Sequence, residues 1–154
     1  MSGMSLIVKN ITRVVAAFVV LFGIYIVLFG HLTPGGGFTG GVIIAAAGVL
    51  IVLAFGVRGL RVILSEQAIT TADCVAALAF AAIALIGYLA GGFFLRWLSM
   101  GEPYALLSAG TIPLSNLAIG FKVGASLYAA FELLALFRSG QDPPPEPAGD
   151  ASED

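Results

Sequence analysis

One strongly apolar stretch, PLSNLAIGFKVGASLYAAFELLALF at residues 113–137, contains two ionisable side chains, Lys122 and Glu132. A charge placed in hydrocarbon costs at least about 2.5 kcal/mol, so an ionisable residue in such a run is a candidate for function. On a helix these two side chains would lie about 15 Å apart along the axis. They are therefore too far apart to pair, and each needs a partner elsewhere.

Lys122 can be explained in two ways, and the sequence leaves both open. As a structural residue it would form an ion pair with a neighbouring subunit. As a functional residue it would relay protons or cations, since a buried lysine gives up its proton readily. For Glu132, which lies nearer the end of the run, we expect a structural role, with cation coordination as the alternative.

The helical periodicity of the same run separates two faces. At about 100° per residue, Asn116, Gly120 and Gly124 share one face. Ser115, Lys122 and Ser126 share roughly the opposite face. Small residues at this spacing let helices approach closely, so the helix is predicted to have a smooth packing side and a polar side. The pair Gly87 and Gly91 predicts a similar packing surface on the preceding hydrophobic run.

The sequence GHLTPGGGFTGG at residues 30–41 contains the chain's only histidine, His31. We favour a tight turn in which Thr33 caps the next helix and Pro34 takes its first position. Glycines permit unusual dihedral angles and close packing; here they are Gly35, Gly36, Gly37, Gly40 and Gly41. The alternative is unwound backbone that lines an ion path, in which His31 would pass protons.

The elements that carry these residues are four long hydrophobic runs. Hydrophobic residues make up 59% of the chain and charged residues 10%, whereas a soluble domain carries about 25% charged residues. Each run approaches the ~20 residues that a membrane-spanning helix needs. The sequence therefore predicts an all-α membrane protein with four transmembrane helices, spanning residues 12–30, 38–57, 73–95 and 113–137. Thr70 and Asp73 match a capping box at the start of the third span.

The basic residues predict the orientation of the spans. Those on the side of both termini are Lys9, Arg13, Arg58, Arg61 and Arg138, against Arg96 alone on the other side. Because cytoplasmic loops carry an excess of Lys and Arg, both termini are expected in the cytoplasm. Residues 1–138 are predicted to form the four-helix membrane subunit. The Pro- and acid-rich tail at residues 139–154 is expected to be disordered.

The sequence lacks the residues of a catalytic site. It contains no Ser/His/Asp set, P-loop, Rossmann fingerprint, haem site or metal-binding cluster, so we expect neither an enzyme nor a bound cofactor or metal. The net charge of −2 argues against nucleic acid as a partner. The lone Cys74 is interpreted as a small apolar residue. Together these features predict a small membrane subunit of a larger ion-moving assembly.

Two segments carry a resemblance to a known family. GHLTPGGGFTGGVI at residues 30–43 and PLSNLAIGFKVGAS at residues 113–126 resemble the signatures of the MnhB-like subunits of Mrp-type (Mnh-type) multisubunit Na+/H+ antiporters. The resemblance covers about residues 10–138, and the tail has no counterpart. It implies that His31, Pro34, Phe38 and Lys122 are important to function.

The resemblance also implies a setting for the chain. Such a subunit works within a hetero-oligomeric complex in the prokaryotic cell membrane, as a multi-pass protein among other hydrophobic subunits. The complex exchanges Na+ for H+ and supports pH and Na+ homeostasis. Two alternatives stay open: a Na+-translocating module subunit of a membrane-bound, hydrogenase-like redox complex, and a purely structural scaffold subunit.

Overall fold

The computed structural model describes residues 4–56, 65–89, 91 and 109–138. These residues form four α-helices, which are α1 (Leu6–Leu28), α2 (Gly36–Phe55), α4 (Glu66–Leu89) and α5 (Ile112–Arg138). All four are long and apolar enough to cross a membrane. The predicted all-α class with four candidate spans is therefore confirmed. The predicted tail at residues 139–154 lies outside the described residues.

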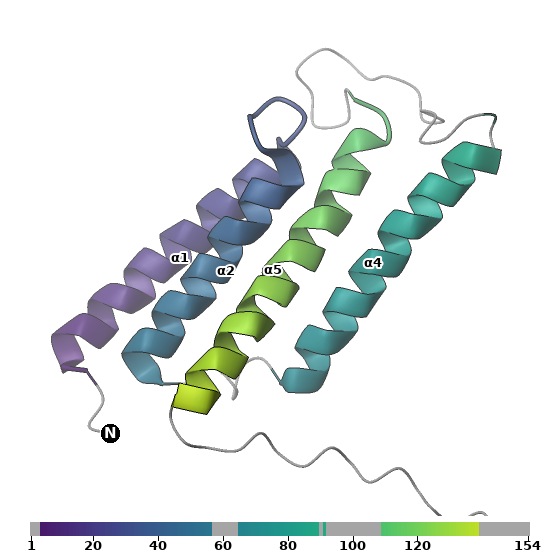
Figure 1. The fold of residues 1–154 in the computed structure, drawn as a ribbon. Coiled ribbons are helices and arrows are strands. Elements are labelled where there is room, and N and C mark those ends of the chain that lie inside the picture. The colour runs from purple at the N-terminus through teal and green to yellow at the C-terminus, as the bar shows by residue number, and fades with distance from the viewer. Residues whose placement is uncertain (1–3, 57–64, 90, 92–108, 139–154) are drawn as a thin grey trace, which may run out of the picture.

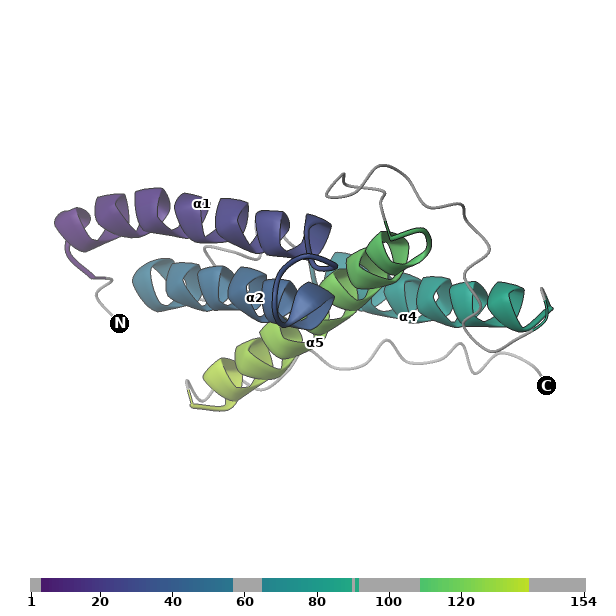
Figure 2. The ribbon, with the colours of Figure 1, turned by 90° about the horizontal axis from the view of Figure 1, so that it is seen from above.

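The helices alternate in direction along the chain. Figure 1 shows α1 and α2 side by side, then α5, then α4, so that α5 lies between α2 and α4. α2 packs against α1 and α5, while α4 packs against α5. The start of α1 and the end of α5 lie at the same end of the molecule (Figure 1). Seen from above, α5 crosses obliquely between the α1–α2 pair and α4 (Figure 2).

The turn between α1 and α2 differs from the predicted one. The Thr33 hydroxyl donates to the Phe29 carbonyl at 3.1 Å, so Thr33 closes the end of α1 and does not cap α2. Gly35 precedes α2 with φ +94°, in the left-handed region that favours glycine. Because α2 begins at Gly36, Pro34 lies in the turn, and the predicted Thr33 cap with Pro34 at the first helical position is wrong.

The start of α4 also differs from the expectation. α4 begins at Glu66, well before the predicted start at residue 73. The Ser65 hydroxyl accepts a hydrogen bond from the backbone N–H of Ala68 at 3.2 Å, which is the geometry of a helix N-cap. Thr70 and Asp73 therefore lie inside the helix, and the predicted capping box is wrong. The Asp73 side chain can instead pair with another helix.

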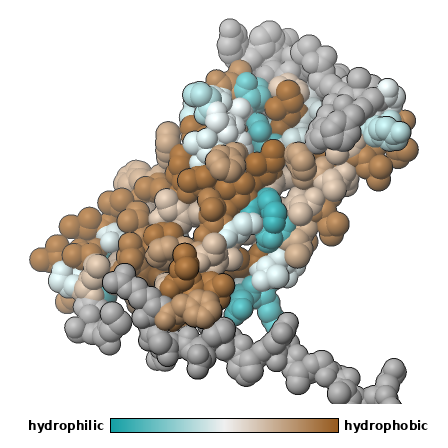
Figure 3. All heavy atoms as spheres, viewed as in Figure 1, coloured by the Kyte–Doolittle hydropathy of each residue, from teal (hydrophilic) through white to brown (hydrophobic). Residues whose placement is uncertain are grey.

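Small side chains occupy much of the interior, and large ones face outward. The buried cluster consists of Ala45, Val52, Ile69 and Tyr128. Phe18, Leu78 and Leu134 are about two-thirds exposed. Figure 3 shows hydrophobic surface over most of the visible face, with hydrophilic surface between α5 and α4. This distribution suits a protein surrounded by lipid or by other apolar subunits.

Candidate functional site

A salt bridge joins the middle of α5 to α4. The Lys122 Nζ donates to both carboxylate oxygens of Asp73, at 2.7 Å to Oδ1 and 2.6 Å to Oδ2. The hydroxyl of Ser126, one turn further along α5, donates to Asp73 Oδ1 as well. Lys122 and Ser126 thus share the polar face that the helical periodicity predicted. Their common partner is a carboxylate of the same chain.

The pair is only partly covered by this chain. The side chain of Lys122 is 43% exposed and that of Asp73 is 29% exposed, although both helices are candidate membrane spans. An ammonium group has three donors, and two of those of Lys122 are used by Asp73. Polar groups left open in hydrocarbon are costly. Since no described side chain other than that of Ser126 forms a hydrogen bond with the pair, its open side calls for water, for polar groups of another subunit, or for groups from the part of this chain that the structure does not describe.

Glycines allow the helix that carries Lys122 to pack directly on α2. A Cβ atom at Gly37 would lie 2.1 Å from the backbone oxygen of Asn116, and one at Gly41 would lie 2.6 Å from that of Gly120. The Gly37 N–H donates to Asn116 Oδ1 at 3.3 Å. The two sequence segments that carry the family resemblance therefore meet backbone to backbone. Close packing of this kind fixes the position of α5 and of Lys122.

The same glycine segment also packs against α1. A Cβ atom at Gly40 would lie 2.8 Å from the carbonyl oxygen of Gly23. Gly36 and Gly35 have positive φ angles of +54° and +94°. Turn formation and close packing are thus both observed at these glycines.

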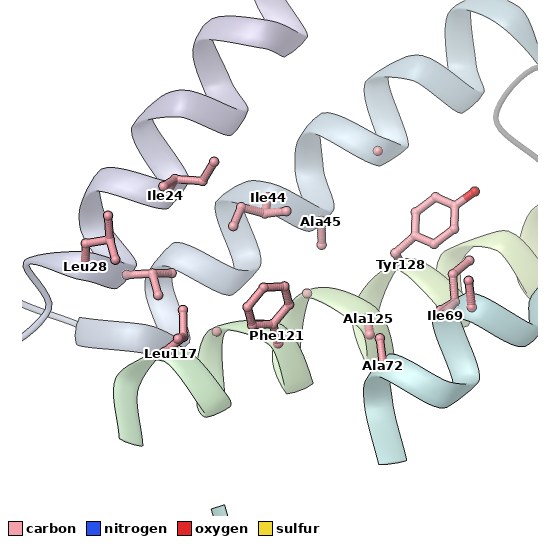
Figure 4. A pocket seen from close by; sticks show the side chains of 15 residues that line it. Ile24, Leu28, Ile44, Ala45, Ile69, Ala72, Leu117, Phe121, Ala125 and Tyr128 are labelled. Carbon is pink, nitrogen blue, oxygen red and sulfur yellow. The ribbon is translucent and has the colours of Figure 1, made fainter. Parts of the chain in front are cut away.

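On another side of α5 lies an apolar pocket of about 440 Å³. Figure 4 shows side chains of all four helices around it, among them Ile24, Ile44, Phe121 and Ile69. Neither Lys122 nor Asp73 lines this pocket. The seam between α4 and α5 therefore has a charged side and a separate apolar side.

The other predicted site residues lie away from the salt bridge. His31 and Pro34 belong to the turn between α1 and α2, and Phe38, in the first turn of α2, is 60% exposed. Asn116, which meets this turn, precedes Lys122 by about 9 Å along the α5 axis. The structure thus places the predicted residues in two separate groups.

Glu132 and three of the four glycines predicted for helix packing lie within helices. Glu132 is buried, at 5% exposure. Gly120 and Gly124 pack on α2, as described for Gly41. Gly87 is buried in α4, but Gly91 follows the end of this helix with φ +118°. Gly87 and Gly91 therefore do not share a helical face in the described part of the chain.

Sequence reasoning missed Asp73 as the partner of Lys122. Thr70 precedes Asp73 at capping-box spacing, and this local pattern indicates a helix start at the wrong place. The signal that could have found the pair is the continuation of the helical pattern upstream, through Ile69 to Ser65, which places a carboxylate inside a membrane helix.

Comparison with known proteins agrees with this architecture. Residues 7–129 match the family described as "Domain related to MnhB subunit of Na+/H+ antiporter". A Na(+)/H(+) antiporter subunit of Bacillus subtilis is 41% identical over 59 residues, which cover 38% of this chain and 41% of that protein. An uncharacterized protein of Methanocaldococcus jannaschii is 35% identical over 136 residues, which cover 84% of this chain and 52% of that protein.

A solved structure is similar as well. The chain matches the membrane-bound sulfane sulfur reductase (MBS), an archaeal respiratory membrane complex, with a TM-score of 0.73 and 31% identity. The match covers 87% of this chain and 59% of that chain. The chain spans about half the length of the curated relatives it matches. The family match nevertheless covers most of the chain, and the chain belongs to the family of domains related to the MnhB subunit of Na+/H+ antiporters.

Proposed function

We propose that this chain is a membrane subunit of a multisubunit monovalent cation/proton antiporter, in which it contributes to Na+ and H+ translocation and to complex assembly. Family membership supports the setting. The observation that carries a part in translocation is the Lys122–Asp73 salt bridge, which is left partly open within two apolar helices. We further propose a prokaryotic cell membrane as its location, with both termini in the cytoplasm.

The chemistry of the pair fits such a role. When the salt bridge opens, the Asp73 carboxylate and the Ser126 hydroxyl offer oxygen ligands, which hard cations prefer. The Lys122 ammonium is then left without its counter-ion in an apolar environment, which is costly, and transfer of a proton from it to water or to a neighbouring subunit removes this cost. A cation that reaches Asp73 therefore competes with the ammonium of Lys122. The pair can couple cation arrival to proton departure without any enzymatic step.

Exchange in vesicles tests this proposal. The complete complex is produced with Lys122→Ala, Asp73→Asn or His31→Ala, and Na+/H+ exchange is measured in inverted membrane vesicles alongside the amount of assembled complex. We expect slower exchange per assembled complex in all three variants. Glu66→Gln, which removes a carboxylate at the exposed start of α4, is the matched control and should exchange like the wild type.

Two outcomes would count against the proposal. If the Lys122 and Asp73 variants assemble and exchange at wild-type rates, the salt bridge has no part in translocation. If exchange falls only in proportion to assembly, the chain acts as a structural scaffold, which is the third alternative raised by the sequence.

The similarity to the MBS complex favours a second setting, a Na+-translocating module of a membrane-bound redox complex. The reconstituted complex separates the two. An antiporter exchanges Na+ for H+ when a pH gradient alone is imposed, whereas a redox-linked complex requires an electron donor and acceptor. Neighbouring genes for iron–sulfur or hydrogenase proteins would point the same way as a requirement for electron transfer.

A further inference from the structure

Two basic side chains gather where α1 begins and α2 ends, far from the salt bridge of α4 and α5. The Lys9 Nζ lies 5.9 Å, and the Arg13 guanidinium carbon 5.1 Å, from the ring centre of Phe55 at the end of α2. The first turn of α1 contains no acidic residue, and among the described residues no carboxylate pairs with Lys9 or Arg13. This end of the pair therefore carries positive charge without a counter-ion from the described part of the chain.

An apolar groove of about 540 Å³ starts at Arg13. Its other lining residues are all apolar and come from α1 and α2; they include Ala16, Ala17, Val20, Ile24 and Ile51. From Arg13 to Ile24 the groove follows α1 for about 16 Å at ~1.5 Å per residue. This is about half of the ~30 Å hydrocarbon thickness of a bilayer, or one leaflet.

We propose that this groove is a binding site for an anionic phospholipid, with one acyl chain along α1 and the phosphate at Arg13 and Lys9. Guanidinium groups bind phosphate oxygens through paired hydrogen bonds, and basic pockets beside membrane helices attract anionic headgroups. The alanines at positions 16 and 17 make the hollow, because larger side chains would fill it. A partner helix would need a carboxylate placed opposite Arg13 as well as an apolar face along the groove. One phospholipid molecule supplies both the anion and the apolar acyl chain.

The length of the groove supports a lipid of the surrounding leaflet over a free anion. A free phosphate would need only the two basic side chains and would gain nothing from the apolar part. α1 and α2 also lie at one side of the molecule and α4 at the other, as Figure 1 shows. Lipid binding here therefore leaves the Lys122–Asp73 pair untouched, and it does not depend on the function proposed above.

Native mass spectrometry of the intact complex, extracted in mild detergent and depleted of lipid, tests the site. The complex is titrated with phosphatidylglycerol, with phosphatidylcholine and with glycerol 3-phosphate, which carries the headgroup charge without acyl chains. We expect saturable binding of phosphatidylglycerol only. Arg13→Gln and Lys9→Gln should each weaken it about fivefold, from the ~1 kcal/mol that a basic residue contributes near an anionic surface.

Groove-filling variants test the apolar part separately. Ala17→Phe should abolish the specific binding of phosphatidylglycerol, because the ring occupies the space of the acyl chain. Ala77→Phe, at an exposed alanine of α4, and Arg138→Gln, at the end of α5, are the matched controls and should bind like the wild type.

Three results would overturn the proposal. Equal binding of phosphatidylcholine, with no effect of the Arg13 and Lys9 variants, would show that these side chains do not bind an anionic headgroup. Unchanged binding of phosphatidylglycerol to the Ala17→Phe variant would show that the acyl chain does not lie in the groove. Efficient cross-linking of Ala17→Cys to another subunit, in a Cys74→Ala background, would show that a partner protein occupies it.

Discussion

Substitution of Gly37 by alanine should separate α2 from α5. The new Cβ atom would lie 2.1 Å from the backbone oxygen of Asn116, where ordinary contacts begin near 3.4 Å. Both groups belong to helix backbone, so neither can rotate away, and the helices must move apart by more than about 1 Å. A gap of this size forfeits a quarter to a half of each neighbouring van der Waals contact.

The size of the effect follows from three contributions. Overpacking costs about 1–3 kcal/mol, and the movement weakens the Gly37–Asn116 hydrogen bond, worth about 0.5–1.5 kcal/mol. Alanine returns up to about 1 kcal/mol through its higher helix propensity. The net destabilisation of the packed helices should be about 2 kcal/mol, which corresponds to roughly a 30-fold change in the equilibrium constant.

The matched control is Gly124→Ala, on the α5 side of the same interface. There the new Cβ atom would meet its nearest neighbour, the backbone oxygen of Gly41, at 3.5 Å, which is an ordinary contact. We expect Gly124→Ala to leave stability unchanged or raise it slightly.

The assay is the temperature at which the chain is lost from the purified complex, followed by size-exclusion chromatography after heating. Gly37→Ala should lower this temperature, and Gly124→Ala should not. Equal thermal stability of Gly37→Ala and the wild type would refute the direct backbone contact between α2 and α5.

Two further predictions concern hydroxyl groups on α4 and α5, each measured by the thermal stability of the same complex. Ser65→Ala should destabilise the start of α4 by about 1 kcal/mol, because it removes the N-cap, whereas Thr70→Ala should have little effect; the opposite order would contradict the observed helix start. Ser126→Ala should cost about 1 kcal/mol, as expected for one hydrogen bond between membrane helices. Ser115→Ala is its control, because the Ser115 hydroxyl donates to the carbonyl of Thr111, just before α5, and not to another helix among the described residues. An equal loss in both variants would argue against the contact with Asp73.

The four candidate membrane helices, and the position of Lys122 within one of them, could be predicted from local sequence. Hydrophobic length identifies a span without knowledge of its neighbours, and a lysine amid apolar residues stands out in any window. The two faces of α5 also follow from helical periodicity alone. The contacts of Gly120 with α2 and of Lys122 with α4 agree with those faces.

The partner of Lys122 could not be predicted, because it depends on how α4 and α5 are placed lengthwise against each other. This placement is a tertiary property that no single window contains. Asp73 is further hidden by a local pattern, since Thr70 and Asp73 have the spacing of a capping box. The prediction for Thr33 was wrong for a similar reason. Its hydroxyl can bond forward to α2 or back to α1, and with Gly35 in the left-handed conformation before α2 it bonds back to α1.

The central claim is that the Lys122–Asp73 salt bridge takes part in Na+/H+ exchange. Its most direct test combines Asp73→Asn with Lys122→Gln. Each single variant leaves one charge in the membrane helices without its counter-ion, which should lower assembly. The cost is smaller than for a fully buried pair, because the side chains of Lys122 and Asp73 are 43% and 29% exposed. The double variant is neutral, so assembly should return toward the wild-type amount. We predict that Na+/H+ exchange per assembled complex stays as slow in the double variant as in the single variants, because residues that act as a unit are not additive. A double variant that regains wild-type exchange would contradict the account, because the salt bridge would then serve only to hold α4 against α5.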